Sequence, residues 1–185
     1  MAVERVELRL KRVASALNAA GVRYAVIGGN AVAAWVAKAD RSATRSTVDV
    51  DLLVERDDLD AVTRVFEGLG FERHDLRRLM LFTDPDEPSR RSGVHLVWAG
   101  QKVLPSYAHP APSIEEAAFD EEQGFWLLDL AALVRMKLTS FRDVDRVHVA
   151  DLIGVGLIEE AVRASLPADL LERLRAVEAT VEPME

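Results

Sequence analysis

Two aspartates placed two positions apart have the clearest potential for chemistry in this sequence. Asp49 and Asp51 lie in a β-rich run, residues 47–54, in which apolar residues alternate with them. Because alternate side chains of a strand point to one face, we expect the two carboxylates to lie together, and the flanking valines and leucines disfavour a merely solvated edge strand. Adjacent carboxylates repel each other and lose hydration inside a fold, and a divalent cation relieves both penalties. The spacing therefore predicts a metal site at Asp49 and Asp51, for Mg²⁺ or Mn²⁺.

A glycine pair precedes these aspartates. Residues 24–27 have the composition of a strand that ends at Gly28 and Gly29, and residues 30–39 have the composition of a helix that Asn30 is able to cap. Glycine has no Cβ, so the pair allows a sharp turn and the close approach of a ligand. The free N–H groups at the start of a helix suit a phosphate. An ordinary turn is the alternative, but the aspartates downstream favour a phosphate-binding loop.

The glycine turn, the helix and the aspartate pair together resemble the nucleotidyltransferase superfamily, whose palm is like that of DNA polymerase β. The fuller phrase, in which GGNAVAA is followed by RSTVDVDLLV, is similar to the AbiEii-type bacterial nucleotidyltransferases, many of them toxins of toxin–antitoxin pairs. A second block, residues 133–153, resembles the helical segment of that group, with Lys137, Arg142 and Asp151 at its recurring positions. The resemblance implies an α/β fold, with a nucleotidyltransferase-like mixed β-sheet palm flanked by helices and followed by a C-terminal helical segment.

The same resemblance implies a Mg²⁺- or Mn²⁺-dependent enzyme that moves a nucleoside monophosphate from an NTP to a hydroxyl of RNA, tRNA in particular, or of a protein. Asp49 and Asp51 would bind the metal. A cognate antitoxin is an expected partner. The nucleotide is expected to contact Gly28, Gly29, Asn30, Arg45, Thr47 and Lys137. For Arg45 the alternative is an ion pair with a nearby acid, and for Thr47 it is an ordinary strand hydroxyl.

The lysine of the second block has an unusual position. Lys137 lies four residues after Leu133 on the apolar face of a predicted helix, residues 130–141, where lysines are rare or extend toward solvent. With the resemblance in view, we expect it to reach the phosphates of a nucleotide. On the next predicted helix, residues 145–155, an acidic and histidine-bearing face is expected to be solvated or paired with arginines rather than to form a metal cluster; it carries Asp145, His148 and Asp151.

One position departs from the superfamily pattern. A third carboxylate usually comes from a neighbouring strand, and in the predicted strand of residues 93–98 this place is taken by His95. Imidazole is a softer ligand than a carboxylate and suits Mg²⁺ poorly, although it is also able to act as a base near the attacking hydroxyl. Two alternatives therefore stay open. One is a catalytically degenerate binding or regulatory module, and the other is a nucleotidyltransferase for small molecules such as antibiotics.

Composition sets broader limits. The chain has 185 residues, a net charge of −8 and no cysteine, which disfavours general attraction to nucleic acid and excludes disulfides. The charged N-terminus is not that of a signal peptide, so we expect a cytoplasmic protein without a membrane partner. We expect a palm over residues 1–105 and a connector with a helical segment over residues 106–185. Smaller elements are expected as a strand at 101–104 and a capped helix at 113–119.

Overall fold

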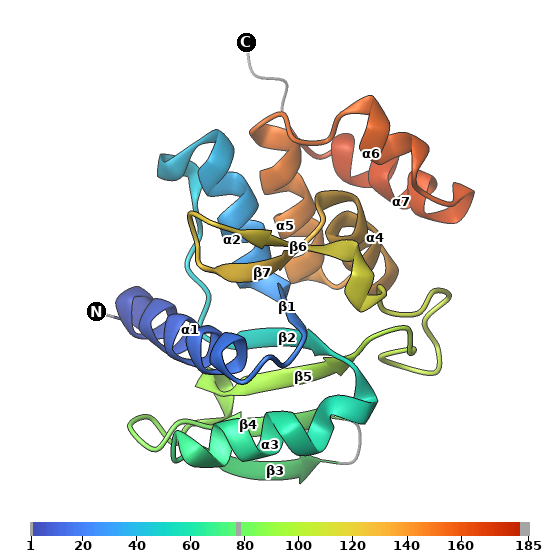
Figure 1. Cartoon of the computed structure of the whole chain (residues 1–185). Helices are drawn as coiled ribbons and strands as arrows, with labels where there is room; N and C mark the ends of the chain where they lie inside the picture. Colours follow the sequence, from blue (N-terminus) through green and yellow to red (C-terminus); the bar gives the residue numbers. More distant parts are fainter. Residues whose placement is uncertain (1, 77–78, 182–185) are drawn as a thin grey trace.

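The computed structural model describes residues 2–76 and 79–181, which form a mixed seven-stranded sheet with helices around it (Figure 1). The sheet order is β3-β4-β5-β2-β1-β7-β6. Strands β2 and β5 are parallel, as are β1 and β7, and the other neighbours are antiparallel. The fold is thus the predicted α/β class. The strands are β1 (Tyr24–Ile27), β2 (Val50–Val54), β3 (Glu72–Leu76), β4 (Leu79–Thr83), β5 (Val94–Trp98), β6 (Ala117–Asp120) and β7 (Phe125–Leu128).

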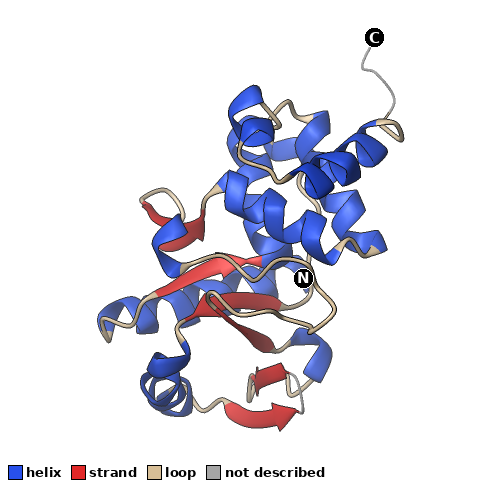
Figure 2. Ribbon diagram, turned by 90° about the vertical axis from the view of Figure 1, so that its right-hand side faces the viewer, coloured by secondary structure: helices blue, strands red, loops and turns tan. Residues whose placement is uncertain are grey.

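Helices pack on the sheet in two groups. Helices α1 and α3 contact each other beside the lower strands in Figure 1, whereas α4, α5 and α7 pack together at the other end, where α2 joins them. Figure 2 shows this second, helical end from the side. None of the helices in the described residues is long and apolar enough to cross a membrane. The helices are α1 (Ala2–Ala19), α2 (Gly28–Ala39), α3 (Leu59–Gly68), α4 (Leu130–Ser140), α5 (Asp143–Gly154), α6 (Glu160–Ala164) and α7 (Ala168–Glu178).

The two central strands β1 and β2 hold the middle of the core. Every residue of β1 is buried, and so is every residue of β2 except Asp51. Apolar β-branched side chains fill both faces of such strands, because helices or other segments cover both sides. A polar residue in this setting needs a partner or a ligand. Asp51 is therefore the position in the central strands that calls for a functional explanation.

Several predicted elements differ from the structure. Strand β2 begins at Val50, so Asp49 lies just before the strand and not inside it. The capping box of Ser113 exists, but it opens a single 3₁₀ turn (Ile114–Glu116), and the chain then enters β6 because β6 pairs with β7. Residues 101–104 form no strand. Since β6 and β7 lie beyond residue 105 yet belong to the same sheet, the division of the chain at that point stays a prediction.

Candidate active site

The predicted carboxylates lie at one edge of the sheet, where the ends of three central strands meet. Asp51, near the start of β2, is opposite Ile27 at the end of β1 and opposite His95 near the start of β5. Gly28 follows Ile27 directly, and Asp49 precedes the strand. Because the three strands are neighbours, their registers bring the glycine turn, both aspartates and the histidine into one place.

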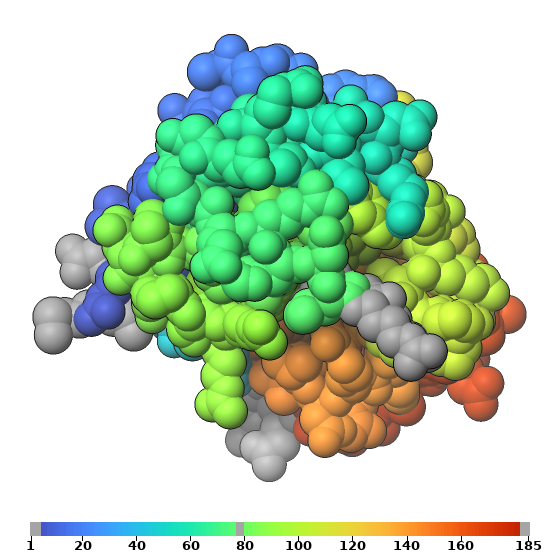
Figure 3. Space-filling model, turned by 90° about the horizontal axis from the view of Figure 1, so that it is seen from below, coloured from blue at the N-terminus to red at the C-terminus, as the bar shows by residue number. Residues whose placement is uncertain are grey.

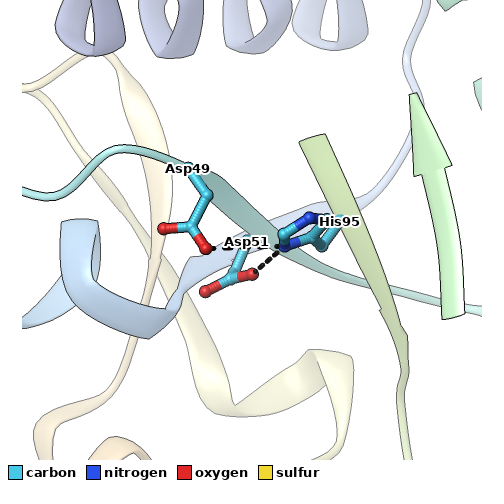
Figure 4. A group of neighbouring side chains, drawn as sticks. All are labelled: Asp49, Asp51 and His95. Atoms are coloured by element: carbon cyan, nitrogen blue, oxygen red, sulfur yellow. Dashed lines mark hydrogen bonds and ion pairs between the residues drawn. The ribbon is translucent and has the colours of Figure 1, made fainter. Parts of the chain in front are cut away.

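The imidazole of His95 faces both carboxylates (Figure 4). Its Nδ1 lies 3.1 Å from Asp51 Oδ1 and 3.6 Å from Asp49 Oδ2. One ligand atom from each of the three side chains lies within 4.8 Å of the others. The hydrogen bond with Asp51 raises the pKa of His95, even though burial opposes this shift. Two oxygen donors and one nitrogen donor thus converge in a group, called here the Asp–Asp–His cluster, that is able to hold a divalent cation.

The glycine turn lies directly against this cluster. Gly28 has a φ of +67°, and a Cβ there would lie 2.0 Å from Asp51 Oδ2, so only glycine fits both the backbone and the contact. Helix α2 begins at Gly28, and among the described residues no side chain caps its first turn. The N–H groups of Gly28 and Gly29 at this helix terminus are therefore of the kind that binds a phosphate.

Asn30 and Thr47 hold the chain around Asp49. The prediction that Asn30 caps α2 is wrong, because the helix starts two residues earlier, at Gly28. Instead, the Asn30 side-chain amide donates to the Asp49 carbonyl oxygen at 2.7 Å. The Thr47 hydroxyl donates to Asp49 Oδ1 at 2.9 Å. Both residues thus position the first aspartate, and their direct contacts with a nucleotide stay predictions.

Lys137 is buried and paired across two helices. Its Nζ donates to Asp145 Oδ1 at 3.1 Å, and the two side chains are 6 % and 0 % exposed. Asp145 also accepts from Ser140 Oγ at 2.6 Å and from Arg142 Nε at 2.8 Å. Burial raises the pKa of Asp145, but the hydrogen bond from Arg142 and the charge of Lys137 outweigh it and lower the pKa to about 2. Of the two expectations for this face, solvation is wrong for Asp145, because helix α4 covers it, whereas pairing with an arginine is confirmed by its ion pair with Arg142.

Lys137 and the Asp–Asp–His cluster line a single cavity of about 570 Å³. Its polar lining also includes Gly28, Gly29 and Thr47. Both the loop between β5 and β6 and the start of α5 contribute to the lining, and in Figure 3 the yellow-green atoms of the loop lie next to the orange segment that includes α5. An apolar lining comes mainly from that loop and from α4, with Val97, Val103, Tyr107, Pro110, Ala111 and Met136. Sequence reasoning missed this lining, although the proline-bearing stretch 105–112 was a signal that the loop has a fixed shape.

Arg45 lies outside this cavity. Its Nε donates to Asp151 at 2.7 Å, and the arginine side chain is 64 % exposed. This is the ion pair that the sequence left open as the alternative. A contact between Arg45 and a triphosphate stays a prediction, because the cavity lining does not include it.

His148 borders the cavity on the side of the glycine turn. A Cβ on Gly29 would lie 3.6 Å from His148 Cε1, and among the described residues His148 Nδ1 is a buried atom without a hydrogen-bond partner. Burial and the nearby charge of Lys137 lower the pKa of His148 to about 4, although Asp145 and Asp151 oppose the shift. His148 is therefore neutral at pH 7.

This shift predicts a pH-dependent loss of stability. The unfolded chain binds a proton at His148 below a pKa of about 6.5, whereas the folded chain does so only near pH 4. The free energy of unfolding should therefore fall as the pH is lowered through this window. His148→Gln should show a shallower fall, measured by urea denaturation at several pH values, and NMR of the histidine Cε1–H should give the pKa directly. Equal pH slopes for both proteins would contradict the assignment.

Comparisons with solved structures identify the fold, whereas comparisons of the sequence find no match. No family model matches the chain, and no curated protein matches its sequence. Among solved structures, the antibiotic-resistance factor ANT(2'')-Ia in solution has a TM-score of 0.55 at 14% identity, over 98% of this chain and 86% of that one. The crystal structure of ANT(2'')-Ia in complex with adenylyl-2''-tobramycin has a TM-score of 0.54 at 18% identity, over 97% and 99%.

A third solved structure is an antigenic nucleotidyltransferase-like protein from Paracoccidioides brasiliensis. Its TM-score is 0.55 at 16% identity, over 98% of this chain and 94% of that one. All three likenesses span nearly the whole of this chain, including the C-terminal helices. At these sequence identities the similarities show the fold alone, and they agree with the mixed sheet and flanking helices described above. The chain therefore has the nucleotidyltransferase fold.

Proposed function

We propose that the protein is a metal-dependent nucleotidyltransferase, which moves a nucleoside monophosphate from an NTP to a hydroxyl acceptor. The observation that carries the proposal is one cavity on the nucleotidyltransferase fold that combines three features: the Asp–Asp–His cluster, the glycine turn and Lys137. Metal ligands, an anion-binding helix terminus and a buried cation are the groups that NTP chemistry requires.

The cluster fits a divalent cation. Its three ligand atoms are close enough to share one ion, and the side chains of His95, Asp49 and Asp51 keep 17%, 32% and 27% of their surface exposed. A bound cation supplies charge neutralisation at the reacting phosphate and activates the attacking hydroxyl. The cluster also lies against Gly28, so a phosphate on the glycine turn would be next to it.

The other residues of the cavity bind and orient the NTP. The N–H groups of Gly28 and Gly29 donate to phosphate oxygens, and Lys137 offsets the negative charge that develops on the pyrophosphate. The acceptor oxygen forms a bond to the α-phosphorus while the bond from that phosphorus to the pyrophosphate oxygen breaks. The proton of the acceptor hydroxyl passes to a carboxylate oxygen of the Asp–Asp–His cluster.

For the acceptor, we propose a hydroxyl of RNA, with tRNA as the first choice, or of a protein. Support comes from the resemblance of residues 28–54 and 133–153 to the AbiEii-type nucleotidyltransferases. As a member of that group, the protein would act as a toxin that a cognate antitoxin restrains. A macromolecular acceptor would present its hydroxyl at the mouth of the cavity, where the exposed Val48 and Val144 belong to the lining.

A small-molecule acceptor is the second candidate. It is favoured by the cavity volume of about 570 Å³ and its apolar lining, which are typical of small-molecule sites. It is also favoured by the fold similarity to an antibiotic-resistance factor whose structure contains adenylyl-2''-tobramycin. Such an acceptor would lie against Val103 and Tyr107 of the loop between β5 and β6.

One labelling experiment separates these acceptors. The purified protein is incubated with each NTP, labelled at the α-phosphate, with Mg²⁺ or Mn²⁺, and with total bacterial RNA, bacterial protein extract or a panel of aminoglycosides. We expect label in one acceptor class, and none when the label is at the γ-phosphate, because the pyrophosphate leaves. No transfer from any NTP to any acceptor, by a protein with a native circular-dichroism spectrum, would contradict the proposal. Calorimetric binding of NTP would then identify a binding module.

A further inference from the structure

The nitrogen donor is the feature that sets this site apart from an all-carboxylate one. His95 Nδ1 lies 3.1 Å from Asp51 Oδ1 and 3.6 Å from Asp49 Oδ2, so it faces the point on which the carboxylates converge (Figure 4). A base that receives a proton from an acceptor must instead face the acceptor. The observed orientation therefore favours His95 as a ligand.

The backbone keeps this nitrogen in place. Strands β2 and β5 pair in parallel over five positions, and Asp51 is opposite His95 at the second of them, with a buried pair on either side. The neighbours of His95 along β5, Val94 and Leu96, are 0 % and 2 % exposed, so the strand is anchored in the core on both sides. Moving the imidazole away would require a shift of the strand or a strained rotamer. An ion held by both aspartates must therefore accept a nitrogen close by.

Metal ions differ in how well they accept this donor set. Mg²⁺ favours oxygen ligands in a nearly ideal octahedron and retains several waters, whereas first-row transition ions accept imidazole readily. Of these ions, Mn²⁺ also suits carboxylate and phosphate oxygens. We propose that the Asp–Asp–His cluster selects Mn²⁺ over Mg²⁺ by direct coordination through His95 Nδ1. This inference rests on the proposed function, because it specifies the metal of the same site.

Metal binding is tested on the full chain without NTP. Titration with MnCl₂, followed by electron paramagnetic resonance, gives the affinity, and competition with MgCl₂ gives the selectivity. Pulsed measurements on the bound Mn²⁺ report coupling to a ligand nitrogen. We expect nitrogen coupling in the wild type and binding of Mn²⁺ on the order of tenfold tighter than that of Mg²⁺. In His95→Asp the coupling should vanish and the preference for Mn²⁺ should decrease.

A matched control uses another histidine of the same sheet. His74, on the edge strand β3, is hydrogen-bonded to Thr83 Oγ1 at 2.9 Å. His74→Asn should keep both the nitrogen coupling and the selectivity. Mn²⁺ without nitrogen coupling, equal affinities for Mg²⁺ and Mn²⁺, or no metal binding would each overturn the inference. Coupling without any nucleotidyl transfer would support the inference and count against the proposed function, whereas transfer with Mg²⁺ alone would do the reverse.

Discussion

We expect the proposed nucleotidyl transfer to fall at least about a thousandfold when Asp49 and Asp51 are both changed to asparagine. Asparagine keeps the shape of each side chain but removes the negative charge that attracts a divalent cation and favours its binding. The remaining proposed ligand, His95, would be neutral in a metal complex, so it would not hold the ion alone. The rate is measured with the α-labelled NTP and the acceptor class that the wild type uses.

A matched control carries the same change of charge elsewhere. Asp57 and Asp60, before and at the start of α3, are exposed, and changing both to asparagine also removes two negative charges. This control should keep transfer within a few-fold of the wild type, because surface charges act weakly at a distance through salt-containing solvent. Transfer that survives in the variant of Asp49 and Asp51, with native circular dichroism, would contradict a role for these carboxylates in the reaction.

The glycine turn and the aspartate pair were predictable because each is encoded within a short stretch of the sequence. The apolar run before Gly28 and Gly29 specifies a strand and a turn, and the alternation around Asp51 specifies a strand with one polar side chain. The α/β fold class was implied by the family resemblance that these signals carry, and the structure confirms it. The pattern placed the start of this strand too early. Strand β2 begins at Val50, so Asp49 lies before it and is positioned by hydrogen bonds from Asn30 and Thr47.

Contacts between segments that are distant in the sequence could not be predicted from such local patterns. The position of His95 beside Asp51 depends on the pairing of β2 with β5, and only the family resemblance pointed to it. Most of strand β6 was predicted as part of a helix, because the capping box of Ser113 is typical of a helix start. The pairing of β6 with β7, which follows it after a turn, determines the strand instead. Strand pairing adds stability that no local propensity encodes.

The burial of Asp145 was not foreseen for the same reason, and it leads to a testable change in stability. On α5 alone, Asp145 belongs to a polar face with His148, and such a face is expected to be solvated or paired with arginines. Helix α4 supplies the buried Lys137 across that face, and Arg142 and Ser140 complete the set of donors. A sequence pattern reports the polarity of one helix, but burial depends on which helix packs against it.

Changing Asp145 to alanine is expected to lower the free energy of unfolding by about 3–5 kcal/mol, because it leaves Lys137 buried without its counter-charge. Asp145 is 0 % exposed and ionised above a pKa of about 2. Because its folded pKa is lowered, its contribution is present above the unfolded pKa of about 3.9 and is lost as the pH falls toward 2. Urea denaturation at pH 7 measures the loss, with equal slopes required for the comparison.

Two further variants decide whether the loss comes from an uncompensated charge. Asp143→Ala removes an acid that is 94 % exposed on the same helix, in an ion pair with Arg146, and should change stability by only a small fraction of the loss at Asp145. Lys137→Met combined with Asp145→Leu removes both buried charges and should be more stable than Asp145→Ala, since apolar groups of similar size replace a buried pair with little penalty. If Asp145→Ala and Asp143→Ala were equally stable, the buried pair would contribute nothing to stability. Lys137 would then be free to exchange Asp145 for a phosphate without destabilising the fold.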